Sequence, residues 1–321
     1  MVNTAVMGAT GLVGETMIQV LQDRSFPADR FIPFASKRSK GRSVVFRGRK
    51  YPVEIITPES LSKGMIIFGA TSADIARNWV PMCIQAEAVV IDNSSAYRMD
   101  PGVPLIVPEV NGHLVKREQR LWANPNCSTI QLVMALRPIM ELAGILWVAV
   151  STYQAVSGAG TPALKELRRQ QKGQAPSGGH PEFHGNVVTG IGETSAEGFC
   201  NEEIKLMSET GKILETDFPI YASAARVPVK TGHTESVTVK LDRRVDIQLV
   251  RQALQDAPGV TLSNSGASPL NVAGSDAVVV DRVRTSPMDP SALQFWVLAD
   301  NLRKGAALNA VQIAETYLKT I

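Results

Sequence analysis

The sequence predicts an α/β protein: a Rossmann-type dinucleotide-binding domain, followed by an α+β domain with a mainly antiparallel sheet. Three observations support this fold class. A glycine-rich turn follows the first apolar strand, strands and helices alternate over the first third of the chain, and the later strands are separated by few helices. Alternation predicts a parallel sheet covered on both faces, whereas strands with few helices between them favour antiparallel pairing.

The first domain is expected to contain short buried strands joined by helices. The predicted strands are residues 4–7, 31–35, 65–68 and 88–92, with an additional strand or hairpin at 42–53. A helix follows the first strand, because apolar residues recur at helical spacing through Met17, Ile18 and Leu21.

The second domain is expected to be richer in strands. Its predicted strands are 147–153, 236–241, 277–280 and 293–298, its predicted helices are 163–171 and 201–214, and 173–198 is a Gly-, Pro- and Ser-rich loop. An amphipathic helix at 305–317 closes the chain. We assign residues 1–126 with 304–321 to the first domain and residues 127–303 to the second.

Composition excludes several classes of protein. The chain has 321 residues, 44% of them hydrophobic, and a formal net charge of +3, which is too small to favour a nucleic-acid partner. Its three cysteines form no metal-binding or disulfide pattern, as expected for a reducing compartment. With no secretory signal and no membrane-spanning run in the sequence, we expect a soluble cytoplasmic protein without a membrane partner.

The glycine-rich turn is the first candidate binding site. Gly8, Gly11 and Gly14 lie between the first strand and the first helix. Glycine lets the backbone approach a pyrophosphate closely, and the helix N-terminus offers unpaired N–H groups. Tight packing alone would also explain the three glycines, but their place at the first strand–helix turn favours nucleotide binding.

The residues after the second strand indicate which nucleotide is bound. An acidic residue there favours NAD, yet the sequence has Arg38 and Ser39 between Lys37 and Lys40. Arg38 and Ser39 are suited to a 2′-phosphate, so we expect NADP. The alternative is a solvated basic turn.

Cys127 is the strongest catalytic candidate. It lies in a polar segment, 124–131, directly before an apolar helical run. The positive end of a helix dipole favours thiolate, the nucleophilic form, over thiol. Attack on a carbonyl then gives an oxyanion, for which backbone N–H groups at the helix start, together with Asn126, are candidate donors. The alternative reading is a small buried hydrophobic residue.

Other polar residues are candidates to complete the site. His233 follows a glycine and precedes a strand, which suggests an exposed corner where a histidine of near-neutral pKa transfers protons. Arg98, in a polar loop, is suited to clamp a phosphate or carboxylate. Glu202 and Lys205 share a helix face, and an exposed ion pair is their simplest interpretation. His180 and His184, beside Glu182, do not make a metal site in this loop context.

Six segments together resemble the aspartate-β-semialdehyde dehydrogenase family, in its order and over essentially the whole chain. They are GATGLVG at 8–14, DNSSAYRMD at 92–100, NPNCSTIQ at 124–131, STYQAVSGAG at 151–160, RVPVKTGH at 226–233 and GAALNAVQIAE at 305–315. Two segments, 69–72 and 186–192, depart from the family pattern.

The resemblance implies a function and a set of site residues. Cys127 is the implied nucleophile, His233 the acid–base residue and Gln154 the substrate-orienting glutamine. Substrate and phosphate binding is implied for Arg98, Asn126, Glu202, Lys205 and Arg226. The cofactor-binding residues predicted from the glycine turn, the basic turn and the resemblance are Gly8, Thr10, Gly11, Leu12, Val13, Gly14, Arg38, Ser39, Ser157, Gly158, Asn309 and Gln312.

The implied reaction is the NADP- and phosphate-dependent interconversion of L-aspartate-4-semialdehyde and L-4-aspartyl phosphate through a cysteine thioester. It belongs to the biosynthesis of lysine, threonine, methionine and isoleucine. The resemblance also implies that the second domain carries the catalytic cysteine and forms most of a homodimer interface; whether dimers pair into tetramers stays open. Two alternatives stay open: an N-acetyl-γ-glutamyl-phosphate reductase, and a non-catalytic NADP-binding paralogue.

Overall fold

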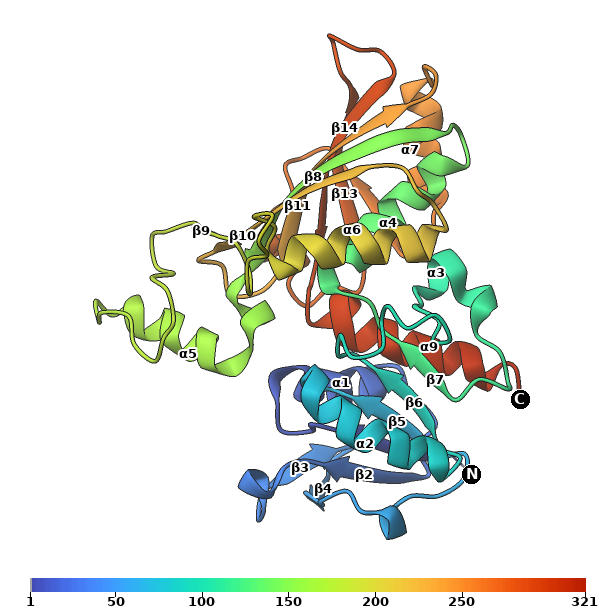
Figure 1. Ribbon diagram of the computed structural model, residues 1–321, viewed down its shortest axis with the longest axis vertical. Coiled ribbons are helices and arrows are strands. Elements are labelled where there is room, and N and C mark those ends of the chain that lie inside the picture. Colours follow the sequence, from blue (N-terminus) through green and yellow to red (C-terminus); the bar gives the residue numbers. More distant parts are fainter. Residues whose placement is uncertain (1) are drawn as a thin grey trace. The chain divides into compact units, whose positions relative to one another are not determined.

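A computed structural model describes residues 2–321. The chain divides into two compact units (Figure 1). Unit 1 comprises Met1–Pro125 and Ala306–Ile321, and unit 2 comprises Asn126–Gly305. Within the described residues, no helix combines the length and apolar character needed to cross a membrane.

Unit 1 is built on a parallel five-stranded sheet in the order β2-β1-β5-β6-β7. The strands are β1 (Asn3–Met7), β2 (Arg30–Phe34), β5 (Ile66–Gly69), β6 (Val89–Asp92) and β7 (Leu121–Ala123). The stretch predicted as an extra strand or hairpin is a hairpin of β3 (Ser43–Phe46) and β4 (Arg49–Pro52).

Helices cover both faces of this sheet, as the near-continuous apolar strands require. Alternate strand residues such as Val6 and Phe68 enter a core with α1 (Leu12–Asp23) and α9 (Leu308–Leu318). The intervening residues, such as Ala5 and Ile67, pack against α2 (Ala73–Gln85) on the other face. The small helix α3 (Pro108–Asn111) contacts α9.

Unit 2 contains a seven-stranded sheet in the order β12-β13-β14-β11-β8-β10-β9. Its strands are β8 (Ile145–Ala155), β9 (Val188–Thr189), β10 (Ile220–Val227), β11 (His233–Leu241), β12 (Val260–Ser263), β13 (Val278–Thr285) and β14 (Ala292–Ala299). The sheet is mixed but mainly antiparallel, as predicted, because only the β8–β10 and β12–β13 pairs are parallel.

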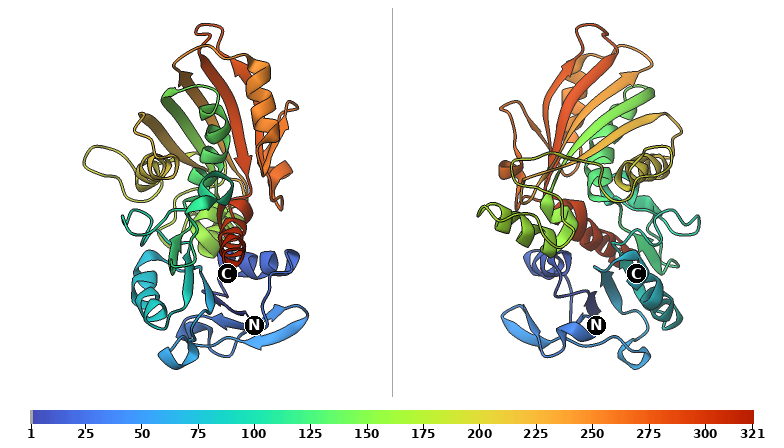
Figure 2. Two further views of the ribbon diagram at one scale, coloured as in Figure 1. Left: turned by 90° about the vertical axis from the view of Figure 1, so that its right-hand side faces the viewer. Right: turned by 60° about the vertical axis from the view of Figure 1, so that its left-hand side comes forward.

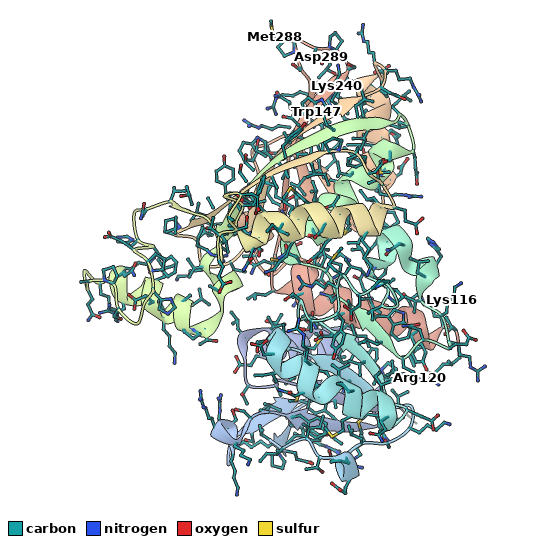
Figure 3. The ribbon with its side chains drawn as sticks, in the orientation of Figure 1. Lys116, Arg120, Trp147, Lys240, Met288 and Asp289 are labelled. Atoms are coloured by element: carbon teal, nitrogen blue, oxygen red, sulfur yellow. The ribbon has the colours of Figure 1, made fainter. Side chains whose placement is uncertain are left out.

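Three helices pack on one face of the unit 2 sheet (Figure 2). They are α4 (Cys127–Met140), α6 (Asn201–Leu214) and α7 (Ile247–Asp256). Side chains on the other face include Tyr153 and Tyr221, which are exposed. Helices α5 (Gly160–Gln170) and α8 (Pro269–Val272) lie in connecting segments. At one end of the sheet Lys240 pairs with Asp289, both labelled in Figure 3.

Several predicted boundaries were wrong in detail. The last helix begins at Leu308 instead of residue 305, because Arg303–Ala307 forms a wider π-helical turn. The helix predicted at 163–171 begins three residues earlier, at Gly160. Strand β10 and helix α7 were not predicted.

Candidate active site

Cys127 is the first residue of α4, as predicted, and this helix has a side-chain N-cap. Asn126 is the N-cap, and its Oδ1 accepts hydrogen bonds from the backbone N–H groups of Ser128 at 2.9 Å and Thr129 at 3.4 Å. The sulfur therefore lies where the helix dipole favours an anion.

Helix α6 holds this cap through two carboxylates. Glu209 Oε2 accepts the backbone N–H of Asn126 at 2.6 Å, and Glu202 Oε1 accepts from Asn126 Nδ2 at 2.7 Å. Lys205 Nζ donates to the other oxygen of Glu202 at 3.2 Å. The prediction of an exposed Glu202–Lys205 pair was wrong for the carboxylate, which is buried because α6 packs against α4.

Neighbouring polar and cationic groups favour the ionised form of Glu202 in spite of its burial. Burial raises the pKa of the Glu202 carboxyl, but Lys205, Asn126 and Arg226 outweigh it, so the pKa lies below its usual value. Glu202 is therefore an anion beneath the cap of the nucleophile's helix.

The oxyanion donors predicted at the helix start are largely committed to other partners. The N–H groups of Ser128 and Thr129 bond to the Asn126 side chain, and Asn126 Nδ2 bonds to Glu202. A residue that caps a helix uses its own polar atoms for the backbone, so these groups are poorly placed to bind an incoming oxygen. The prediction of oxyanion donors at the helix start, which also includes the N–H of Cys127, stays a prediction.

Gln154 and Arg226 lie opposite each other on the parallel strands β8 and β10. Arg226 Nη1 donates to Gln154 Oε1 at 3.4 Å and to the carbonyl of Ala155 at 2.9 Å. Gln154 Nε2 in turn donates to Ser128 Oγ at 3.1 Å. The carboxamide therefore links the arginine to the first turn of the nucleophile's helix.

The Arg226 guanidinium is buried but close to negative charge. Burial lowers the pKa of Arg226, while Glu202 and Cys127 raise it. Coulombic attraction is mutual, so the same cation favours the thiolate form of Cys127. Arg226 is thus both a candidate anion-binding group and an electrostatic partner of the nucleophile.

His233, at the start of β11, is buried rather than exposed. The exposed corner was a wrong prediction, because β8 and β14 flank this strand and the imidazole has 0% exposed surface. Its Nδ1 accepts a hydrogen bond from the backbone N–H of Ala155 at 3.0 Å. Burial and then the charge of Arg226 lower the pKa of His233 to about 3, so the expected near-neutral pKa was also wrong.

Gly158 brings these groups around one small space. A Cβ at this position would lie 2.8 Å from Arg226 Nη1 and 3.3 Å from His233 Nε2. Any side chain here would fill the space between the guanidinium and the imidazole. The structure therefore places Gly158, predicted as a cofactor residue, against the candidate catalytic groups of unit 2.

Ser157 and Asn301 brace the same region. The Ser157 hydroxyl hydrogen-bonds with the Asn301 side chain, with Asn301 Nδ2 at 2.8 Å. Asn301 Oδ1 also accepts the N–H of Gly232 at 2.9 Å, directly before His233. The Ser157 hydroxyl, predicted to bind cofactor, is thus committed to positioning this turn.

The glycine turn of unit 1 joins β1 to α1 and is closely packed. Gly8 has a φ of +85°, and a Cβ there would lie 2.3 Å from the carbonyl oxygen of Ala70. A Cβ on Gly14 would lie 2.2 Å from the carbonyl oxygen of Gly8. Packing alone therefore explains these two glycines.

Gly11 is different, since a Cβ there would meet only the Gly8 oxygen, at 3.4 Å. Gly11 is the N-cap of α1, a position where glycine is common. Its open surroundings also leave room for the pyrophosphate that a dinucleotide fold binds at this helix N-terminus. Leu12 and Val13 open α1 beside it and are half-buried.

The basic turn after β2 is tied to this loop. Thr10 Oγ1 and Ser39 Oγ share a hydrogen bond of 3.0 Å, and Ser39 is buried while Arg38 is exposed. The predicted cofactor residues of the two turns therefore belong to one continuous surface of unit 1 at the carboxyl ends of β1 and β2.

Arg98 is fixed within unit 1 by backbone carbonyls. Its Nε donates to the Asn124 oxygen at 2.9 Å and its Nη2 to the Asn93 oxygen at 2.7 Å. Asp92 shapes the loop by accepting from the Ser94 hydroxyl at 2.5 Å. The predicted pairing of Arg98 with Lys205, a residue of unit 2, stays a prediction.

Asn309 and Gln312 on α9 make contacts inside unit 1. Asn309 Nδ2 donates to the Ile106 carbonyl and to Asn124 Oδ1, both at 2.8 Å, and the residue is fully buried. Both hydrogens of this amide are used, which favours a structural role for Asn309. Gln312 Nε2 donates to Glu109 Oε1 at 2.8 Å.

The sequence reasoning overlooked four residues that shape the site: Ser128, Glu209, Asn301 and Gly305. Glu209 could have been found, because it follows Glu202 by two helical turns and so lies on the same face of α6. Gly305 and Asn301 gave no local signal, since their partners lie more than 60 residues away.

Comparison with known proteins identifies two domains in the chain. Residues 3–118 match the family described as semialdehyde dehydrogenase, NAD binding domain, and residues 136–304 match semialdehyde dehydrogenase, dimerisation domain. The aspartate-semialdehyde dehydrogenase of Aquifex aeolicus is 41% identical, over 98% of this chain and 97% of its own.

Solved structures of similar sequence have the same fold. The crystal structure of aspartate semialdehyde dehydrogenase II from Vibrio cholerae has a TM-score of 0.93 and 37% identity, covering 99% of this chain and 98% of that one. A second structure of the Vibrio protein, described as complexed with ASA, has the same TM-score and coverage at 36% identity. The fold class and the resemblance expected from the sequence are therefore confirmed.

Proposed function

The chain belongs to the aspartate-semialdehyde dehydrogenase family, and from this premise we propose that it interconverts L-aspartate-4-semialdehyde and L-4-aspartyl phosphate through a thioester on Cys127. The observation that carries the proposal is the cluster within unit 2: a cysteine at a capped helix start, a buried imidazole, and a guanidinium that interacts electrostatically with Cys127 and Glu202. Oxidation of an aldehyde through a thioester requires a nucleophile, a polar group for the adduct oxygen and a cation that binds anions.

In the oxidising direction, the Cys127 thiolate attacks the aldehyde carbon to form a hemithioacetal. His233 faces the adduct oxygen, because its Nε2 borders the space lined by Gly158. When bound, a pyridine nucleotide would supply the hydride acceptor, and loss of hydride from the adduct carbon would leave a thioester on Cys127. Inorganic phosphate then attacks the acyl carbon, releasing the acyl phosphate and restoring the thiolate.

Arg226 is proposed to hold the substrate carboxylate, because a buried guanidinium donates two parallel hydrogen bonds to such a group. Glu202 is proposed to attract the substrate amino group, and Gln154 to orient the chain between them. Arg98 and Lys205 are proposed to bind the phosphate, with Asn126 beside them.

The cofactor is a pyridine nucleotide, since residues 3–118 match a NAD-binding domain, and we propose NADP in particular. Gly11 leaves room for the pyrophosphate, so the residues present fit the group. Exposed Arg38 beside Ser39 supplies a cation and a hydroxyl where an acidic residue would bind the ribose of NAD.

A homodimer is proposed through the open face of the unit 2 sheet, which belongs to the matched dimerisation domain. Aromatic side chains pair on this face: Trp147 with Tyr221, and Tyr153 with Trp296. Aromatic residues are enriched at protein interfaces. Sedimentation of the wild type and of Tyr221→Asp tests this, and an unchanged dimer in the variant would argue against this face.

A phosphate-dependent assay of NADPH formation tests the function. We expect activity with L-aspartate-4-semialdehyde, loss of turnover when phosphate is omitted, and little activity with N-acetylglutamate-5-semialdehyde. A preference for the acetylated substrate, or turnover independent of phosphate, would overturn the proposal.

A further inference from the structure

We propose that Asp300 is a positioning residue, which sets Cys127 and His233 relative to each other through two segments of backbone that its carboxylate holds. The inference rests on the proposed function, because it gives Asp300 a part in the reaction of Cys127. Asp300 directly follows β14 and is only 4% exposed, so its side chain lies inside unit 2.

The first segment runs from Asp300 to the nucleophile. Asp300 Oδ1 accepts the backbone N–H groups of Leu302 at 2.8 Å and Arg303 at 3.1 Å. Its backbone oxygen accepts the N–H of Gly305 at 3.0 Å. These bonds close residues 300–305 into a tight turn. A Cβ added at Gly305 would lie 3.3 Å from Cα of Cys127, so the end of this turn packs directly against the nucleophile.

The second segment runs from Asp300 to the histidine. Asp300 Oδ2 accepts the backbone N–H of Gly274 at 2.7 Å, just after α8. At the start of α8, Pro269 packs against Gly232, where an added Cβ would lie 2.9 Å from the Pro269 carbonyl oxygen. Gly232 directly precedes His233. Residues 269–274 therefore connect Asp300 with the turn that carries the imidazole.

Both segments end in a close backbone contact at a glycine. Gly305 meets Cys127 and Gly232 meets Pro269 with no room for a Cβ between them. A contact of this kind has no flexible side chain to absorb movement, and packed interiors transmit strain. A displacement of the Asp300 carboxylate therefore moves both glycines, and with them the two reacting side chains. A displacement of about 1 Å in a positioned reaction costs about 10² in rate.

The two-sided contact explains why the residue is an aspartate. A carboxylate accepts hydrogen bonds at both oxygens, whereas the carboxamide of asparagine accepts at only one. Asparagine at position 300 can serve the turn at 302–305 or the N–H of Gly274, but not both. The N–H left over is then buried without a partner, which is costly.

Substitution of Asp300 tests the inference through kinetics. We expect Asp300→Asn to lower kcat about tenfold and Asp300→Ala about 100-fold, because one or both segments are released. The KM values for the semialdehyde and the nucleotide should change little, since the substrate-binding side chains keep their own contacts. A wild-type kcat in Asp300→Asn would overturn the inference.

Asp281→Asn is the matched control for stability. Asp281 is also a buried aspartate of unit 2, and its Oδ2 accepts the backbone N–H of Ala267 at 2.9 Å. The variant is expected to lower the melting temperature without lowering kcat. Equal losses of kcat in Asp281→Asn and Asp300→Asn would show that Asp300 only stabilises the fold.

A double-mutant cycle tests the route to the nucleophile. Asp300→Ala and Gly305→Ala disturb the same contact with Cys127, so their effects on kcat should not multiply. We expect the double variant to lose little more than the more damaged single variant. A loss equal to the product of the two single losses would exclude this route.

Hydrogen exchange of the resting enzyme tests both segments without turnover. We expect faster exchange in residues 301–305 and 269–274 of Asp300→Ala, and in one of these two segments of Asp300→Asn. Wild-type exchange in both segments of both variants would overturn the inference. Absence of phosphate-dependent turnover in the wild type would refute the proposed function and leave this measurement valid.

Discussion

A Cβ atom added at Gly305 would lie only 2.9 Å from Cβ of Cys127. Carbon atoms pack without strain at about 3.5–4.0 Å, so a methyl group at residue 305 must displace the nucleophile or its helix. Residue 305 is therefore part of the site even though it carries no functional group.

Gly305→Ala is expected to lower kcat about 100-fold, since a displacement of about 1 Å costs this much in a positioned reaction. Steady-state kinetics and thermal unfolding separate this effect from misfolding. Gly102→Ala is the matched control, because a Cβ there meets nothing within 4 Å. Similar kinetics in both variants would remove the steric constraint on Cys127.

Arg38→Ala is expected to raise the KM for NADP about 10–100-fold, because a hydrogen bond to a charged group contributes about 1.5–3 kcal/mol. The KM for NAD should change little. Arg49→Ala, an exposed arginine on β4, serves as the control. Equal effects of Arg38→Ala on the two nucleotides would place the 2′-phosphate elsewhere.

Arg226→Lys is expected to raise the KM for the semialdehyde at least about tenfold, which corresponds to about 1.4 kcal/mol. Lysine replaces a planar fork with a point charge and loses the paired contacts to Gln154 and Ala155. Initial rates at varied substrate concentration measure the effect, with exposed Arg168→Lys as the control. Unchanged kinetics would exclude Arg226 from the carboxylate site.

Glu235→Gln is expected to become more stable, relative to the wild type, as pH rises. Burial raises the pKa of Glu235 well above its usual range, so the folded state keeps a proton that the unfolded state releases above about pH 4.5. The wild type therefore loses up to about 1.4 kcal/mol per pH unit from this group, and the glutamine variant does not.

Urea unfolding of both proteins at several pH values checks this difference. A constant gap in the free energy of unfolding from pH 5 to about pH 8 would show that Glu235 titrates alike in both states. Glu235→Leu tests the polar contacts separately, because Ser128 and Gln131 lie beside the carboxyl.

Features that depend on neighbours along the chain could be predicted from sequence. The glycine turn, the helix that starts at Cys127 and the helix from Asn201 to Leu214 follow from local patterns of apolar residues and caps. The family motifs add the site residues because each is a short contiguous segment.

Features that depend on strand pairing could not be predicted. His233 looked exposed because it follows a glycine, but its burial comes from β8 and β14, which are distant in sequence. The small alanines of β10 weaken its alternation, which hid the strand carrying Arg226. Helix α7 did leave a usable signal, since Asp246 caps its first turn.

Trapping the acyl group on Cys127 is the direct test of covalent catalysis. Enzyme mixed with L-aspartate-4-semialdehyde and NADP, without phosphate, should form about one NADPH per subunit and carry the acyl mass on the Cys127 peptide. Added phosphate should discharge this adduct, and Cys127→Ser should bind NADP but show neither adduct nor turnover. Sustained NADPH formation with an unmodified Cys127, or near wild-type rates in Cys127→Ser, would contradict covalent catalysis at this residue.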